Sequence, residues 1–209
     1  HIFNTGIYCI QTGFIGCSSG QSGGAIYLKN NYTIPNAFRF ENLYFERNQA
    51  LYGGACYFYS SSIENHVVVL NCDFISNTAN EQESSSKKYG GSAIFLTARI
   101  GWINSCSFHG NEGPGSDLRI YNHFVKGDII DSKLLNSINQ SFIKSNCDFE
   151  ISKNSNSCIY YIRGDYSSSL FEIKDCKFNG ELAPTASYID GKTLSELSPN
   201  LIVKNCIFS

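Results

Sequence analysis

The heptapeptide Asn71-Cys72-Asp73-Phe74-Ile75-Ser76-Asn77 is the stretch of this 209-residue chain that decides its fold. Altered versions of it return along the chain, for example over Ser105 to Asn111 and Asn205 to Phe208. The phenylalanine of each version stands at Phe14, Phe45, Phe74, Phe108, Phe149, Phe178 and Phe208. Their spacings are 31, 29, 34, 41, 29 and 30 residues, and a fixed repeat of about 30 residues is typical of stacked-coil proteins.

Each repeat carries two further strand signals. Before the asparagine, apolar residues alternate with a period of two, as in Val67 and Val69, and about eleven residues after the phenylalanine comes a segment such as Gly53-Gly54-Ala55-Cys56. Period-two alternation predicts strands with one apolar face. Three short strands per repeat, each paired with its copy one coil along, predict an all-β parallel β-helix of about seven coils that forms one domain over residues 1–209.

Stacked coils place equivalent side chains about 4.8 Å apart, so the repeats predict columns. We expect an internal aromatic stack of Phe45, Phe74, Phe108, Phe149, Phe178 and Phe208. Beside it we expect a thiol column of Cys72, Cys106, Cys147, Cys176 and Cys206. An amide ladder at a tight bend would hold Asn42, Asn71, Asn146 and Asn205, and a second ladder Asn48, Asn77 and Asn111. Asparagine suits such bends because it tolerates left-handed backbone.

Composition excludes several classes of function. The net charge is −2 and 16% of residues are charged, which leaves no basic field for nucleic acid. No apolar run reaches 18 residues, so a membrane contact would require a part of the chain outside this sequence. There is no Cys-x-x-Cys motif and the four histidines are scattered, so we assign no metal, no cofactor and no catalytic residue.

Two insertions interrupt the repeat, and the sequence has no methionine. Residues 80–89 are polar and charged and predict an exposed loop. Residues 122–140 include apolar pairs, so we expect them to pack on the outside of the helix. The missing methionine and an end in mid-repeat lead us to expect a segment of a longer chain.

Two short motifs recur together in the first 120 residues. Phe-x-x-Asn occurs at Phe45 to Asn48, Phe74 to Asn77 and Phe108 to Asn111, and Gly-Gly-Ala-Ile occurs at Gly23 to Ile26. In these motifs the chain resembles the polymorphic outer membrane protein (Pmp) family of bacterial autotransporter adhesins; similar repeats occur in large surface proteins of unicellular eukaryotes. The resemblance implies a right-handed parallel β-helix, an extracellular or cell-surface location, and adhesion to host or cell-surface proteins or glycans.

Several surface features suggest partners or modification. Arg163-Gly164-Asp165 resembles the integrin-recognition motif, and a simple glycine turn is the alternative. Asn31 and Asn139 begin glycosylation sequons. Tyr27, Tyr57 and Phe95 predict an outward aromatic row, either a platform for sugar rings or simple cross-strand packing.

The cysteines and acidic residues leave two questions open. The stacked thiols are either buried and free or joined by one or more disulfides. Asp73 and Asp148 share an outward column but are separated by Ser107, and two such acids do not by themselves make a catalytic site.

We therefore expect a non-enzymatic extracellular repeat scaffold of adhesin type that binds protein or glycan partners. One alternative is a structural subunit of an extracellular fibre that associates end to end. The other is a polysaccharide lyase or hydrolase on a pectate-lyase-like β-helix, which would need acids clustered on one face.

Overall fold

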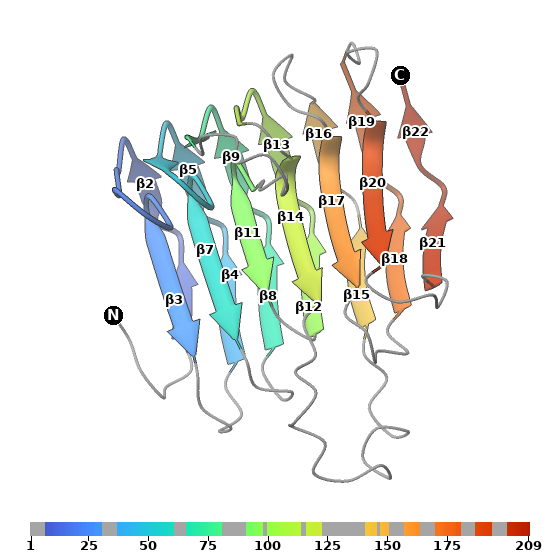
Figure 1. Cartoon of the computed structure of the whole chain (residues 1–209), viewed down its shortest axis with the longest axis horizontal. Helices are drawn as coiled ribbons and strands as arrows, with labels where there is room; N and C mark the ends of the chain where they lie inside the picture. Colours follow the sequence, from blue (N-terminus) through green and yellow to red (C-terminus); the bar gives the residue numbers. More distant parts are fainter. Residues whose placement is uncertain are drawn as a thin grey trace, which may run out of the picture.

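The chain folds as an all-β parallel solenoid, seen in a computed structural model (Figure 1). The structure describes residues 7–30, 37–60, 66–80, 91–97, 100–113, 116–122, 141–145, 147–150, 157–163, 170–180, 187–193 and 200–209. Successive coils follow one another from the blue N-terminal side of Figure 1 to the red C-terminal side. The expected fold class is confirmed, and the right-handed sense of the coil stays a prediction.

The first sheet has seven parallel strands in the order β1-β4-β8-β12-β15-β18-β21. Their bounds are β1 (Ile7–Ile10), β4 (Ala37–Glu41), β8 (His66–Leu70), β12 (Ile100–Asn104), β15 (Ser141–Ser145), β18 (Leu170–Lys174) and β21 (Asn200–Lys204). These are the period-two segments that precede each asparagine. In β4, β8 and β12 the alternation buries one face, as Phe40, Val69 and Ile103 show, and turns the other face outward.

The second sheet also has seven parallel strands and contains the repeated phenylalanines. Its strands are β2 (Gly13–Ile15), β5 (Tyr44–Glu46), β9 (Asp73–Ile75), β13 (Ser107–His109), β16 (Asp148–Glu150), β19 (Lys177–Asn179) and β22 (Ile207–Phe208). Each phenylalanine pairs in register with the phenylalanine one coil along, as Phe74 does with Phe45 and Phe108.

The third sheet has six strands, in the order β20-β17-β14-β11-β7-β3. Its strands are β3 (Ile26–Asn30), β7 (Cys56–Ser60), β11 (Ile94–Thr97), β14 (Ser116–Asn122), β17 (Ser157–Arg163) and β20 (Ser187–Thr193). A small additional sheet pairs β6 (Gln49–Ala50) with β10 (Thr78–Ala79). The three larger sheets enclose one core to which each coil contributes apolar side chains, such as Phe40, Phe45 and Phe58 from neighbouring sheets.

The glycine pair in front of the third sheet has a steric cause. Gly53 has a φ of +61°, a left-handed value that side-chain-bearing residues rarely adopt. A Cβ atom on Gly54 would lie 2.1 Å from the carbonyl oxygen of Ser92 in the next coil. The pair therefore lets two coils approach each other at this corner.

Two predicted insertions lie mostly outside the described residues. Residues 81–89 of the loop predicted over 80–89, and residues 123–140 of the insertion predicted over 122–140, are not among them. Their conformations stay predictions.

Candidate functional site

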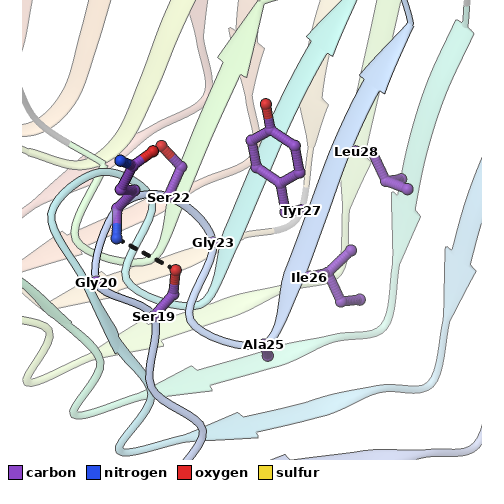
Figure 2. Close-up of a pocket in the computed structure, with 9 residues that line it drawn as sticks. Ser19, Gly20, Ser22, Gly23, Ala25, Ile26, Tyr27 and Leu28 are labelled. Carbon is purple, nitrogen blue, oxygen red and sulfur yellow. Dashed lines mark hydrogen bonds between the residues drawn. The ribbon is translucent and has the colours of Figure 1, made fainter. Parts of the chain in front are cut away.

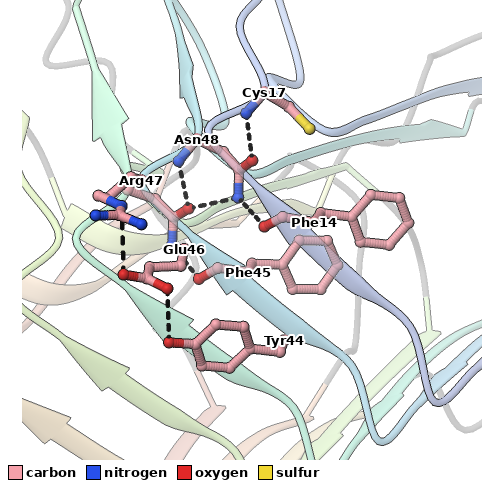
Figure 3. Close-up of polar contacts among 8 residues, drawn as sticks. Phe14, Cys17, Tyr44, Phe45, Glu46, Arg47 and Asn48 are labelled. Atoms are coloured by element: carbon pink, nitrogen blue, oxygen red, sulfur yellow. Dashed lines mark hydrogen bonds and ion pairs between the residues drawn. The ribbon is translucent and has the colours of Figure 1, made fainter.

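A buried amide ladder joins the coils beside the second sheet (Figure 3). Asn48, Asn77 and Asn111 are fully buried. The Nδ2 atom of Asn48 donates to Oδ1 of Asn77 at 2.9 Å, and Nδ2 of Asn77 donates to Oδ1 of Asn111 at 2.9 Å. The same Nδ2 atoms also donate to the carbonyl oxygens of Phe14 and Phe45, each at 3.0 Å. Because burial without partners is costly, this network explains why asparagine occupies the position.

The phenylalanine column forms a continuous internal stack. Ring centroids of successive members lie 4.6–5.1 Å apart, with interplanar angles of 8° or less. The stack comprises Phe14, Phe45, Phe74, Phe108, Phe149, Phe178 and Phe208. Its spacing follows the spacing of the strands, so its role is packing between coils.

The nine cysteines are free thiols, and five form the predicted column. Cys72 and Cys176 donate their thiols to the carbonyl oxygens two residues earlier, at 3.1 Å and 3.2 Å. Burial raises the pKa of Cys106 well above its usual value, while the hydrogen bond with Cys106 lowers the pKa of Cys72. The column members are Cys72, Cys106, Cys147, Cys176 and Cys206. The buried Cys106, whose pKa is raised, therefore acts as a small apolar group rather than a nucleophile.

The second asparagine ladder lies at an exposed bend. Asn42, Asn71 and Asn205 have φ values of 56°, 50° and 53°. Nδ2 of Asn71 donates to Oδ1 of Asn42 at 3.3 Å, and Nδ2 of Asn205 donates to Oδ1 of Asp175 at 3.2 Å. Asn146 is outside the described residues. This ladder therefore stabilises a bend and presents little chemistry.

The rings of the outward aromatic row on the third sheet stack on one another. Tyr27 stacks on Tyr57 at 5.4 Å and Tyr57 stacks on Phe95 at 4.9 Å between centroids. The guanidinium of Arg119 lies 5.0 Å from the Phe95 centroid. A sugar ring would need the face of an aromatic ring, and the inner faces of this row are occupied by neighbours. The geometry thus favours cross-strand packing over a sugar platform.

A hollow of about 620 Å³ lies around the first strand of the third sheet (Figure 2). Its lining comprises Ser19, Gly20, Gln21, Ser22, Gly23, Ala25, Ile26, Tyr27 and Leu28. The backbone N–H of Gln21 donates to Oγ of Ser19 at 3.3 Å within it. The described residues of this lining include no Asp, Glu, Lys, Arg or His.

The outer face of the first sheet is different, because its centre is an exposed indole. Trp102 on β12 is 45% exposed and is the single tryptophan of the sequence. Val68 on the neighbouring strand β8 pairs with Trp102 in register, and Leu70 pairs with Asn104. Among the described aromatic rings, none stacks on Trp102. The indole is therefore partly exposed at the surface of this sheet.

Ion pairs frame this apolar centre on both sides. On β4, Nη2 of Arg39 lies 3.0 Å from Oε2 of Glu41. On the other side, Nζ of Lys204 lies 3.5 Å from Oε1 of Glu172 on β18. An aromatic centre within a charged rim is the anatomy of a protein interface. We call this surface the Trp102 face and define it by Arg39, Glu41, Val68, Leu70, Trp102, Asn104, Glu172, Lys174 and Lys204.

The acids considered for catalysis do not assemble into an acid-base pair. Asp73 and Asp148 flank Ser107 in register on the second sheet, and Oγ of Ser107 donates to Oδ1 of Asp73. Asp148 accepts a hydrogen bond from Nδ2 of Asn179 at 2.9 Å. Each carboxylate is thus held by its own neighbour. Within the described residues, no three His, Cys, Asp or Glu side chains form a group that suits a metal ion.

The predicted attachment motifs fall largely outside the described residues. Asn31 and Asn139 of the two sequons, and Gly164 and Asp165 of the integrin-type motif, are not described. Arg163 is the last residue of β17. The predictions made for these motifs therefore stay predictions.

The sequence alone did not single out the Trp102 face. The inward phenylalanine column of the second sheet repeats one residue type, whereas the outward column that holds Arg39, Val68 and Trp102 changes at each coil, so no column signals the face. The usable signal was a lone tryptophan at an outward strand position, between Val68 and Ile143 in register.

Comparison with protein families, with curated proteins and with solved structures finds no match to the chain. None of the described residues forms a helix with the length and hydropathy needed to cross a membrane.

Proposed function

We propose that this chain is a non-enzymatic extracellular repeat scaffold of adhesin type, which binds a protein or glycan partner through the Trp102 face. The proposal includes a cell-surface location and kinship with the Pmp-like repeats that the Phe-x-x-Asn and Gly-Gly-Ala-Ile motifs resemble. The observation that carries it is the exposed indole of Trp102, 45% accessible on a parallel sheet between two ion pairs.

The inward side chains support a scaffold role. The buried asparagines, phenylalanines and thiols bond or pack with their copies one coil along, which accounts for the repeated motifs without any ligand. Large exposed aromatic residues are over-represented at binding surfaces, where their burial supplies much of the affinity.

A panel of extracellular matrix proteins and surface glycans tests the proposal. Immobilised ligands would be probed with the wild-type chain, with Trp102→Ala, and with Ile15→Ala as a matched control. Ile15 is 56% exposed on β2 in the second sheet, so its truncation removes apolar surface elsewhere. We expect Trp102→Ala to abolish binding and Ile15→Ala to preserve it. Binding that survives Trp102→Ala would contradict the proposal.

The same panel separates the scaffold from the lyase or hydrolase. Release of reducing ends or unsaturated products from a polysaccharide, lost on Asp148→Ala, would replace the proposal with the enzymatic alternative. We expect no product release.

A further inference from the structure

The charges of the Trp102 face form a pattern that complements itself. In the first sheet β12 is the central strand, β4 lies two strands before it and β18 lies two strands after it. Arg39 and Glu41 alternate with the buried residues of β4, and Glu172 and Lys174 alternate with buried Ile173 of β18. Along the common strand direction, β4 thus presents the positive Arg39 before the negative Glu41. In the same direction β18 presents the negative Glu172 before the positive Lys174.

A two-fold axis along β12 brings these charges together in two copies. Such an axis reverses the order of the strands, keeps the direction along them, and sets the two identical sheet faces against each other in an isologous interface. Arg39 of one copy then meets Glu172 of the other. Glu41 likewise meets Lys174, and each pair occurs twice because the interface is isologous.

The apolar residues match under the same operation. Trp102 meets Trp102 of the second copy at the axis, where two indoles can stack with an offset. Val68 meets the register position of Ile143, since β8 and β15 are the two neighbours of β12. Asn104 meets Asn104, so amide faces amide.

We propose that the Trp102 face is the interface of a homodimer in which two copies pack face to face with antiparallel solenoid axes. This inference rests on the proposed function, because it names a second copy of the chain as a protein partner of the same face. Such a dimer is geometrically possible, because two sheets can pack face to face about 10 Å apart.

The available area sets the expected strength. Seven strands spaced at about 4.8 Å and five residues long cover roughly 500 Å² on each copy. The total of roughly 1,000 Å² lies at the lower limit for a specific protein interface. We therefore expect a reversible dimer with a dissociation constant in the micromolar range, on the order of 1–100 µM.

The alternative to this antiparallel dimer is a dimer in which the two solenoid axes run parallel. A two-fold axis along the solenoid would set Arg39 against Glu41 of the second copy, which also pairs opposite charges. It would, however, set Trp102 against Asn104. Covering an amide with an indole costs free energy that the antiparallel arrangement avoids.

Sedimentation equilibrium of the 209-residue chain, with far-UV circular dichroism to verify folding, tests the dimer. Trp102→Lys places two like charges at the axis and should raise the dissociation constant at least about 30-fold. The double variant Arg39→Glu/Glu41→Arg keeps the ion pair within the chain but opposes like charges across an antiparallel interface. We expect a loss of at least about tenfold, most of it recovered when Glu172→Lys/Lys174→Glu is added.

The matched control inverts an ion pair on another surface. Arg47 Nε lies 3.3 Å from Glu46 Oε1 beside the second sheet, and Glu46→Arg/Arg47→Glu should leave the dissociation constant unchanged. A dimer that tolerates Arg39→Glu/Glu41→Arg overturns the antiparallel arrangement, and one that tolerates Trp102→Lys overturns the interface. A chain that stays monomeric overturns the dimer. If that monomer still binds a panel ligand through Trp102, the proposed function stands without the dimer.

Discussion

Phe108 and Trp102 lie six residues apart and stand for two different regions of the molecule. Phe108 is fully buried and stacks between Phe74 and Phe149, with centroids 5.0 Å and 4.6 Å away. Trp102 is 45% exposed and has Val68 beside it in register. The inner column repeats one residue from coil to coil, and the outer column does not. The repeat therefore encodes the fold, and the departures from the repeat on the outer faces carry what is specific to this protein.

The largest expected loss of stability comes from a substitution within the inner phenylalanine stack. Phe108→Ala removes a ring that fits between two others and leaves a cavity, which should lower the free energy of unfolding by about 3–5 kcal/mol. Chemical denaturation followed by far-UV circular dichroism measures the loss. A cost under about 1 kcal/mol would mean that the stack does not hold the coils together.

A slightly smaller loss should follow from breaking the buried amide ladder. Asn77→Ala deprives the backbone N–H of Asn48 and the carbonyl of Phe45 of a side-chain partner, and these lost hydrogen bonds should together cost about 1–3 kcal/mol. The matched variant Asn71→Gly, at an exposed position with a φ of 50°, should change stability by less than about 0.5 kcal/mol. Equal costs in the two variants would contradict the distinction between the two ladders.

Asp117 is an inner residue that departs from the repeat. It is fully buried, its backbone carbonyl accepts from the N–H of Ala93 at 3.0 Å, and its side chain accepts from Oγ of Ser92 at 3.1 Å. Within the described residues its Oδ2 has no hydrogen-bond partner. Burial raises the pKa of Asp117 well above its usual value.

The folded state therefore binds a proton that the unfolded state releases near pH 4. Stability is greatest below that pH and falls as pH rises through the folded pKa. Asp117→Asn should remove this contribution and stabilise the chain by about 1 kcal/mol at neutral pH. Denaturant titrations of both chains at several pH values measure the difference. Wild-type and variant profiles that run parallel between pH 4 and 8 would contradict the raised pKa.

The smallest effect on stability should come from the outer face. Trp102→Ala removes a side chain that is only partly covered, so the free energy of unfolding should change by less than about 0.5 kcal/mol in the dissociated chain. Far-UV circular dichroism at low protein concentration provides this measurement. A loss comparable to that of Phe108→Ala would make Trp102 a core residue and remove it as a binding residue.

The inner architecture was predictable because inward positions face the same neighbours in every coil. Phe74, Cys72 and Asn77 each meet a copy of themselves or a close substitute, so the period exposes them in a single sequence. Trp102 and Asp117 were not predictable as special residues. Their importance depends on which face or corner they occupy, and no repeated column marks either position.

The fluorescence of the single tryptophan is the direct test of a binding role for the Trp102 face. Acrylamide quenching would be measured on the intact chain, first dilute and then at rising concentration or with a panel ligand. We expect an indole that is readily quenched in the dilute chain and at least about twofold less quenched once the Trp102 face is occupied. An indole that is already shielded in the dilute monomer, or that stays equally quenched in every associated state, would contradict a binding role for the Trp102 face.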